Sequence, residues 1–177
     1  MRLETPANLM LGVPNVLGAC RGVNRLAERL VHARPNARFR LVPGVAEMLQ
    51  SLAGRYTLAV ASSGLDRDTR QFLDVTGLAT QFAAVATLGT CARTKPRPDP
   101  LRWVASELGV LLDECLMVGD TTVDIRAGRA AGAQTVGVLC GFGEKDELHR
   151  SGAHLVISST ADLAAHLTPD SRRSVQS

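Results

Sequence analysis

Short apolar runs alternate with stretches of helical spacing along most of the chain. Runs typical of buried strands lie at 56–61, 82–87, 115–118, 134–139 and 155–157. Helical spacing between them predicts helices over 45–53, 66–76, 99–108, 120–131, 144–149 and 161–167. This alternation predicts an α/β fold, a Rossmann-like parallel sheet with helices on both faces. Ligands of such sheets bind where the carboxyl ends of the strands meet.

The N-terminal part of the chain differs from the rest in charge. Residues 1–43 hold seven Arg and two Glu, a local charge of +5, which leaves −2 for the remainder. The arginines alternate with apolar residues, so a solvated helix face explains them better than a nucleic-acid interface. The amphipathic helix expected there has its apolar stripe at Val23, Leu26, Ala27, Leu30 and Val31.

Composition narrows the class of protein further. The 177 residues are 45% hydrophobic and 21% charged, which is typical of a single globular domain and excludes a disordered chain. Aromatic residues make up only 3%, too few for stacking single-stranded nucleic acid. The four cysteines have neither metal-ligand spacing nor disulfide density, so reduced thiols are expected. No apolar stretch suits a membrane span or a secretory signal, and we expect a cytoplasmic protein without nucleic-acid or membrane partners.

The strongest chemical feature is an acidic pair after the strand at 115–118. Asp120 follows the strand directly, and Asp124 lies four residues later on the same face of the expected helix. Two carboxylates at one strand end suit Mg²⁺, which takes oxygen ligands together with water and substrate phosphate. The alternative is structural: Asp120 is an ordinary N-cap, and Asp124 is an acid favoured by the helix dipole.

Lys95 is one of two lysines in the chain, and it lies in the proline-rich segment 94–100. Proline stiffens such a turn, so the ammonium group is held in one place before the next helix. The alternative is a solvated surface charge, which is the usual state of lysine in a loop.

Two further segments follow strand ends. In Ser62, Ser63 and Gly64, a hydroxyl and backbone N–H groups can bind a phosphate oxygen, although Ser-Gly turns are common elsewhere. The segment Gly141-Phe142-Gly143 is a flexible loop that can border a pocket, and a plain turn is its simpler interpretation.

Taken together and in this order, these residues resemble the haloacid dehalogenase-like phosphatase superfamily, most closely its phosphoglycolate phosphatase-like branch. Ser62 matches the family's phosphate-binding Ser/Thr, Lys95 its lysine, and Asp120 with Asp124 its acidic motif. The resemblance extends over about residues 20–167, and the stretches typical of the branch are 42–45, 95–100 and 124–132.

The resemblance implies hydrolysis of a phosphate monoester of a small phosphorylated metabolite. The family's reaction passes through a covalent aspartyl-phosphate, with Mg²⁺ neutralising the phosphate and Lys95 acting as a catalytic residue. Phosphate binding is then assigned to Ser62, Ser63, Gly64 and Lys95, and the metal to Asp120 and Asp124. The implied domains are a partial helical cap over 1–43, the α/β core over 44–168 and a polar tail over 169–177.

One part of the family's pattern is missing. The first motif, a strand ending in Asp-x-Asp-Gly-Thr, supplies the nucleophile, yet no Asp precedes Asp66. Glu4 and Glu28 stand in no comparable context. We therefore expect an inactive protein with weak or no Mg²⁺ binding, and a non-catalytic module that binds a phosphorylated ligand or a protein is the alternative.

The missing motif also concerns the fold, since the family's first strand lies at the centre of the sheet. Either 9–13 forms a substitute strand there, or the chain is truncated. An empty central position would expose apolar sheet edges and favour self-association.

Overall fold

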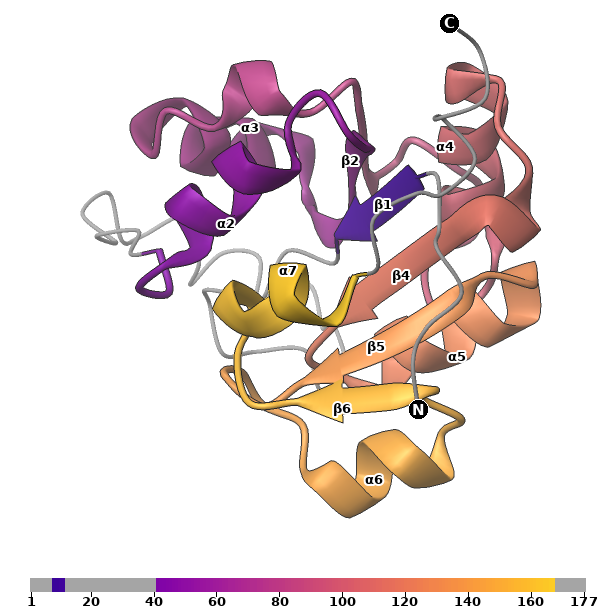
Figure 1. The fold of residues 1–177 in the computed structure, drawn as a ribbon. Coiled ribbons are helices and arrows are strands. Elements are labelled where there is room, and N and C mark those ends of the chain that lie inside the picture. Colours follow the sequence, from indigo (N-terminus) through magenta and orange to yellow (C-terminus); the bar gives the residue numbers. More distant parts are fainter. Residues whose placement is uncertain (1–7, 12–40, 168–177) are drawn as a thin grey trace, which may run out of the picture.

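The computed structural model describes residues 8–11 and 41–167, in which six parallel strands form one sheet (Figure 1). The strand order is β3-β2-β1-β4-β5-β6, and the arrowheads of β4, β5 and β6 point to the same side in Figure 1. The expected parallel α/β sheet is therefore confirmed. The strands are β1 (Asn8–Leu11), β2 (Thr57–Leu65), β3 (Ala84–Leu88), β4 (Cys115–Gly119), β5 (Gln134–Val138) and β6 (Leu155–Ile157).

β1 occupies the central position of the sheet. It pairs with β2 on one side and β4 on the other, so that Leu11 lies opposite both Val60 and Val118. This is the substitute strand expected over 9–13, shifted toward the N-terminus. The core sheet thus includes four residues that precede the expected core, and the described residues show no open edge at its centre.

The helices follow the expected pattern closely, and α4 has the expected bounds. The last expected helix is instead a 3-10 turn, Thr160–Asp162, followed by the short α7. The helix expected around Val23–Val31 and the tail 169–177 lie outside the described residues. The helices are α2 (Val45–Leu52), α3 (Asp66–Val75), α4 (Asp99–Leu108), α5 (Thr122–Ala131), α6 (Lys145–Arg150) and α7 (Leu163–His166).

The junction between β2 and α3 differs from the expectation. β2 does not end before the Ser-Ser-Gly segment but continues through it to Leu65, with a register shift against β3. α3 begins at Asp66 as expected, and its N-cap is Leu65. The Asp66 carboxylate accepts hydrogen bonds from Arg70 (2.9 Å) and Thr87 (3.1 Å). These bonds, that of Arg70 above all, hold the pKa of Asp66 below its usual value.

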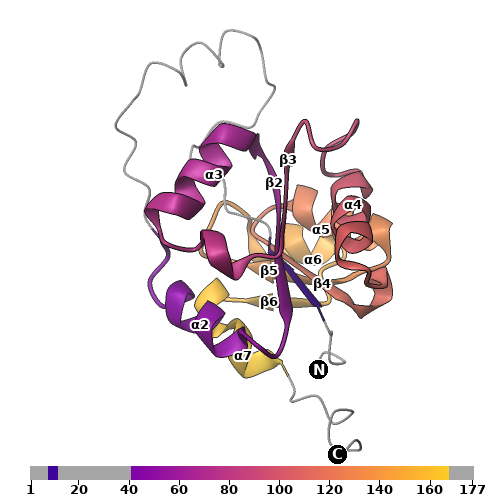
Figure 2. The ribbon, with the colours of Figure 1, turned by 90° about the horizontal axis from the view of Figure 1, so that it is seen from above.

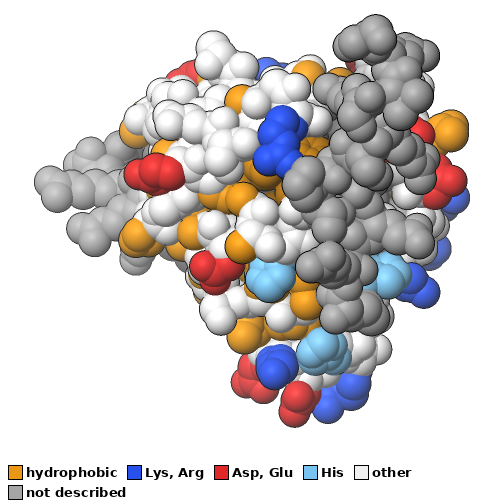
Figure 3. Space-filling model, viewed as in Figure 1, with side chains coloured by type: hydrophobic (Ala, Val, Ile, Leu, Met, Phe, Trp, Pro, Cys, Tyr) orange, Lys and Arg blue, Asp and Glu red, His pale blue; other side chains and the backbone are white. Residues whose placement is uncertain are grey.

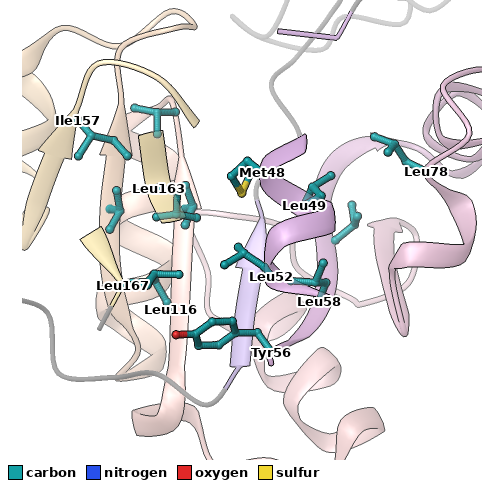
Figure 4. Packing of buried hydrophobic residues seen from close by; sticks show 14 of the residues in the cluster. Met48, Leu49, Leu52, Tyr56, Leu58, Leu78, Leu116, Ile157, Leu163 and Leu167 are labelled. Carbon is teal, nitrogen blue, oxygen red and sulfur yellow. The ribbon is translucent and has the colours of Figure 1, made fainter. Parts of the chain in front are cut away.

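Each face of the sheet has its own apolar layer, because successive strand residues point to opposite sides. The face with large side chains packs against α2, α3 and α7, and the face with small side chains packs against α4 and α5 (Figure 2). Figure 4 shows how Met48, Leu49 and Leu52 of α2 meet Leu116 and Leu163 in the first layer. The buried strand residues of the two layers are Leu58, Val60, Leu116, Val118, Val136, Val138 and Ile157 on the first face, and Ala59, Ala61, Ala84, Ala86, Cys115 and Met117 on the second.

Three observations concern the expectations about partners and compartment. Figure 3 shows basic and acidic side chains interspersed on the viewed face, with no continuous basic stripe among the coloured residues. Among the described residues, Cys91, Cys115 and Cys140 are free thiols. Within the same ranges, no helix combines the length and apolarity that crossing a membrane requires.

Candidate active site

Lys95 is the centre of the polar cluster at the carboxyl ends of β2 and β4. It is only 8% exposed, and its ammonium group donates to the Ala61 backbone oxygen (2.6 Å) and to Asp124 Oδ1 (2.5 Å). These two bonds join the elements on either side of β1. An ammonium group has three N–H donors, and the third has no partner among the described residues. Lys95 is therefore not the solvated loop lysine of the alternative interpretation, and it keeps one donor for an anionic ligand.

Both carboxylate oxygens of Asp124 have partners within the protein. Oδ1 accepts from Lys95, while Oδ2 accepts from the backbone N–H (3.2 Å) and the hydroxyl (2.6 Å) of Thr121. The Thr121 hydroxyl in turn accepts from the Asp124 N–H (3.3 Å), which completes a capping box. The N-cap of α5 is thus Thr121 and not Asp120, and the helix begins at Thr122. The Thr-x-x-Asp spacing was the signal in the sequence for this cap.

Asp120 is the second buried carboxylate, with 2% exposure. Its Oδ2 accepts the backbone N–H of Phe142 (3.0 Å), and Oδ1 accepts no bond from the described residues. Burial raises the pKa of Asp120, the charge of Asp124 adds to this, and the Phe142 N–H and Lys95 partly oppose it.

The loop Gly141-Phe142-Gly143 packs directly on Asp120. A Cβ added at Gly141 would overlap the Asp120 carboxylate, and one added at Gly143 would overlap the Asp120 backbone oxygen. Glycine is therefore required at both positions for the loop to approach this closely. The interpretation of this segment as a plain turn missed that contact, because nothing in the local pattern indicates which residue the loop meets.

The Ser62-Ser63-Gly64 segment is only partly available to a ligand. Ser62 Oγ accepts the Gly64 N–H (3.0 Å) and the Thr69 hydroxyl (3.3 Å). The Gly64 N–H, expected to bind phosphate, is therefore already used within the protein. The hydroxyl proton of Ser62 remains a donor, and Ser62 directly follows Ala61, whose carbonyl binds Lys95.

A family model described as haloacid dehalogenase-like hydrolase matches residues 20–138. The chain belongs to the haloacid dehalogenase-like hydrolase family. The resemblance seen in the sequence is thereby confirmed at the level of the family.

Individual relatives of this haloacid dehalogenase-like protein include phosphatases. It is 34% identical over 142 residues to phosphoglycolate phosphatase of Rhodospirillum rubrum, which covers 78% of this chain and 58% of the relative. The chain thus spans less than two thirds of that relative's length. A hydrolase from Pseudomonas syringae has a similar structure, with 31% identity, a TM-score of 0.70 and coverage of 82% of this chain and 70% of the other. A predicted phosphoglycolate phosphatase from Haemophilus somnus gives 28% identity, a TM-score of 0.67 and coverage of 71% and 56%.

Mg²⁺, which the resemblance to this haloacid dehalogenase-like family implies, would find only part of a ligand set among the described residues. Asp120 Oδ1 has no partner among the described residues, which fits a hard cation that takes one or two carboxylates together with water and phosphate. Asp124 fits less well, because Lys95 and Thr121 already bind both of its oxygens. Within the described ranges, no group of three or more His, Cys, Asp or Glu side chains could hold a metal. The expectation that Asp120 and Asp124 together bind the metal stays a prediction.

Proposed function

We propose that this chain is a haloacid dehalogenase-like phosphatase core that binds the phosphate group of a small phosphorylated metabolite between β2 and β4. The observation behind this is the buried Lys95 ammonium group at the carboxyl edge of the sheet, one of whose N–H donors has no partner in the part of the chain that the structure describes. Charge-assisted hydrogen bonds to phosphate oxygens are among the strong ones in proteins. The phosphatase names of its relatives support a phosphate monoester as the ligand.

Each residue has a distinct part in this proposal. The Ser62 hydroxyl and the Lys95 ammonium group donate to phosphate oxygens, and Asp124 holds Lys95 in position. Asp120 is the residue that would hold Mg²⁺, which when bound neutralises negative charge on the phosphate. The Phe142 N–H keeps the Asp120 carboxylate in one orientation.

We further propose that this chain binds phosphate esters without hydrolysing them. The family's reaction needs a carboxylate that attacks phosphorus, and no Asp precedes Asp66 in the sequence. Of the two carboxylates described at the site, Asp124 is bound at both oxygens by Lys95 and Thr121, and Asp120 is the residue that would hold Mg²⁺. Loss of the nucleophile removes the reaction path itself, whereas binding groups alone give little turnover.

Release of inorganic phosphate from phosphoglycolate and p-nitrophenyl phosphate tests the lack of turnover. With Mg²⁺ in excess, the native chain is expected to release no more phosphate than the Asp120→Asn variant, because neither has a nucleophile. Mg²⁺-dependent turnover by the native chain that disappears in Asp120→Asn would contradict the proposal.

Thermal unfolding in the presence of inorganic phosphate tests the binding step. A ligand that binds only the folded state stabilises it by about 2.7 kcal/mol at a concentration of 100 Kd. We expect Tm to rise with phosphate concentration, and the rise to shrink in Ser62→Ala, which loses one donor. A Tm that does not change with phosphate, or that rises equally with chloride, would show that the site is not a phosphate site.

A further inference from the structure

Phe142 is an exposed aromatic side chain beside the candidate active site. It is 62% exposed, whereas the other aromatic side chains among the described residues are buried (Tyr56 and Phe72) or half-buried (Phe82 and Trp103). Leu139, three residues earlier at the end of β5, is 38% exposed. Burying a phenyl ring is favourable, and an exposed ring does not gain this free energy from the protein itself. An exposed ring beside a ligand site therefore has apolar surface available for contact with the ligand.

The position of Phe142 is set by contacts on both sides of its loop. Its N–H donates to Asp120 Oδ2 at 3.0 Å, and glycines on either side allow the backbone to lie against Asp120. A Cβ at Gly143 would also come within 3.1 Å of Leu148, a fully buried residue of α6. The loop therefore cannot move toward the core. Because the Phe142 N–H is bonded to the Asp120 carboxylate, the Phe142 side chain branches from the backbone next to that carboxylate.

The side chains of this loop also limit the kind of organic group that it can recognise. Residues 139–143 have the sequence Leu-Cys-Gly-Phe-Gly, which contains no charged or amide side chain. The Cys140 thiol lies 3.4 Å from the Thr160 hydroxyl and so already has a polar neighbour. Leu139 and Phe142 therefore offer a ligand apolar surface and no charged or amide group for a carboxylate or a sugar hydroxyl.

Resting on the proposed phosphate site, we propose that Phe142 and Leu139 form an apolar wall for the organic part of the ligand. Phe142 is then a specificity-determining residue that favours phosphate monoesters with an aromatic or bulky aliphatic group. Its backbone N–H donates to Asp120, and its side chain contacts the organic part of the ligand. A ligand with a second charged group would need a charged or polar partner, which an apolar wall does not provide.

Calorimetric titration of the full chain with phenyl phosphate and methyl phosphate tests this wall. The two esters carry the same phosphate group and differ only in the organic part. Contact with one aromatic ring is expected to make phenyl phosphate bind roughly five- to tenfold more tightly. In Phe142→Ala, which retains the backbone N–H and Leu139, the ratio of the two affinities should fall toward one. Leu111→Ala is the matched control, because Leu111 is equally exposed (65%) but lies before β4, at the opposite end of the sheet.

The outcomes separate this inference from the proposed function. Equal affinities for the two esters in the native chain, or an unchanged preference in Phe142→Ala, would overturn the apolar wall and leave the phosphate site standing. Failure of both esters and of inorganic phosphate to bind would overturn the proposed function and the wall with it. A phenyl preference lost in Phe142→Ala and kept in Leu111→Ala would support both.

Discussion

Replacing Lys95 with methionine is expected to lower the free energy of unfolding by about 3–5 kcal/mol, as removal of one partner from a buried ion pair does. The side chains of Lys95 and Asp124 are only 4% and 6% exposed, so the variant leaves a carboxylate buried without its cation. It also leaves the Ala61 carbonyl without its ammonium donor. Denaturant unfolding of the native and variant chains at pH 7 measures the difference, provided that the m-values agree.

Two further variants show whether the buried charge causes this loss. Adding Asp124→Asn to Lys95→Met removes the unpaired charge, so the double variant should be more stable than Lys95→Met alone. Arg70→Met breaks the exposed pair with Asp66, in which the side chains are 59% and 51% exposed, and should cost far less than Lys95→Met because solvent screens the two charges. A Lys95→Met chain that loses no more stability than Arg70→Met would show that the buried pair adds nothing to the fold.

Gly128→Ala is expected to destabilise the protein by about 2 kcal/mol, although alanine is the better helix former by about 1 kcal/mol. Gly128 lies inside α5 where the helix meets the sheet. A Cβ there would lie 2.5 Å from Thr135 Cγ2 and 2.9 Å from Met117 Cβ. Overpacking of this kind costs about 1–3 kcal/mol, and neither neighbour can move without shifting β4 or β5, so the overlap outweighs the helical preference.

A substitution at Thr135 tests the same overlap between the added Cβ and the sheet, because it changes the sheet residue instead of the helix residue. Thr135→Ser removes the methyl group that the new Cβ would meet, so Gly128→Ala should cost less in a Thr135→Ser background than in the native chain. Denaturant unfolding of the four chains gives this coupling directly. A more stable Gly128→Ala variant would mean that α5 can move away from the sheet at no cost.

Gly128 and the Lys95–Asp124 ion pair are linked through α5, because Gly128 and Asp124 both lie on this helix. The close approach at Gly128 sets the distance of α5 from β4 and β5, and Asp124, one turn earlier, receives Lys95. A shift of α5 would therefore also move Asp124 relative to Lys95. We expect Gly128→Ala to weaken phosphate stabilisation as well as folding, since Lys95 depends on Asp124 for its position.

The pattern of apolar residues predicted most of the helices and strands, because apolar residues recur with helical spacing in the helices and form short continuous runs in the strands. The bounds of α4 and β6 were predicted to the residue, since Asp99 opens the helix, Gly109 follows it, and a three-residue apolar run forms β6. The start of α5 was misplaced because two residues could both act as a cap. Thr121 took that place, since Asp120 turns toward the Phe142 N–H of the next loop.

The sequence by itself determined the α/β class, the family and the absence of an Asp before Asp66. It also supplied the six candidate residues Ser62, Ser63, Gly64, Lys95, Asp120 and Asp124. These follow from residue types and short spacings. Only the tertiary structure decided which donors and acceptors stay free for a ligand, because the deciding bonds join distant positions. Lys95 meets Asp124 29 residues away and Ala61 34 residues away, and Asp120 meets Phe142 22 residues away. The central place of β1 was settled in the same way, since a four-residue run becomes a strand there by pairing with β2 and β4 at once.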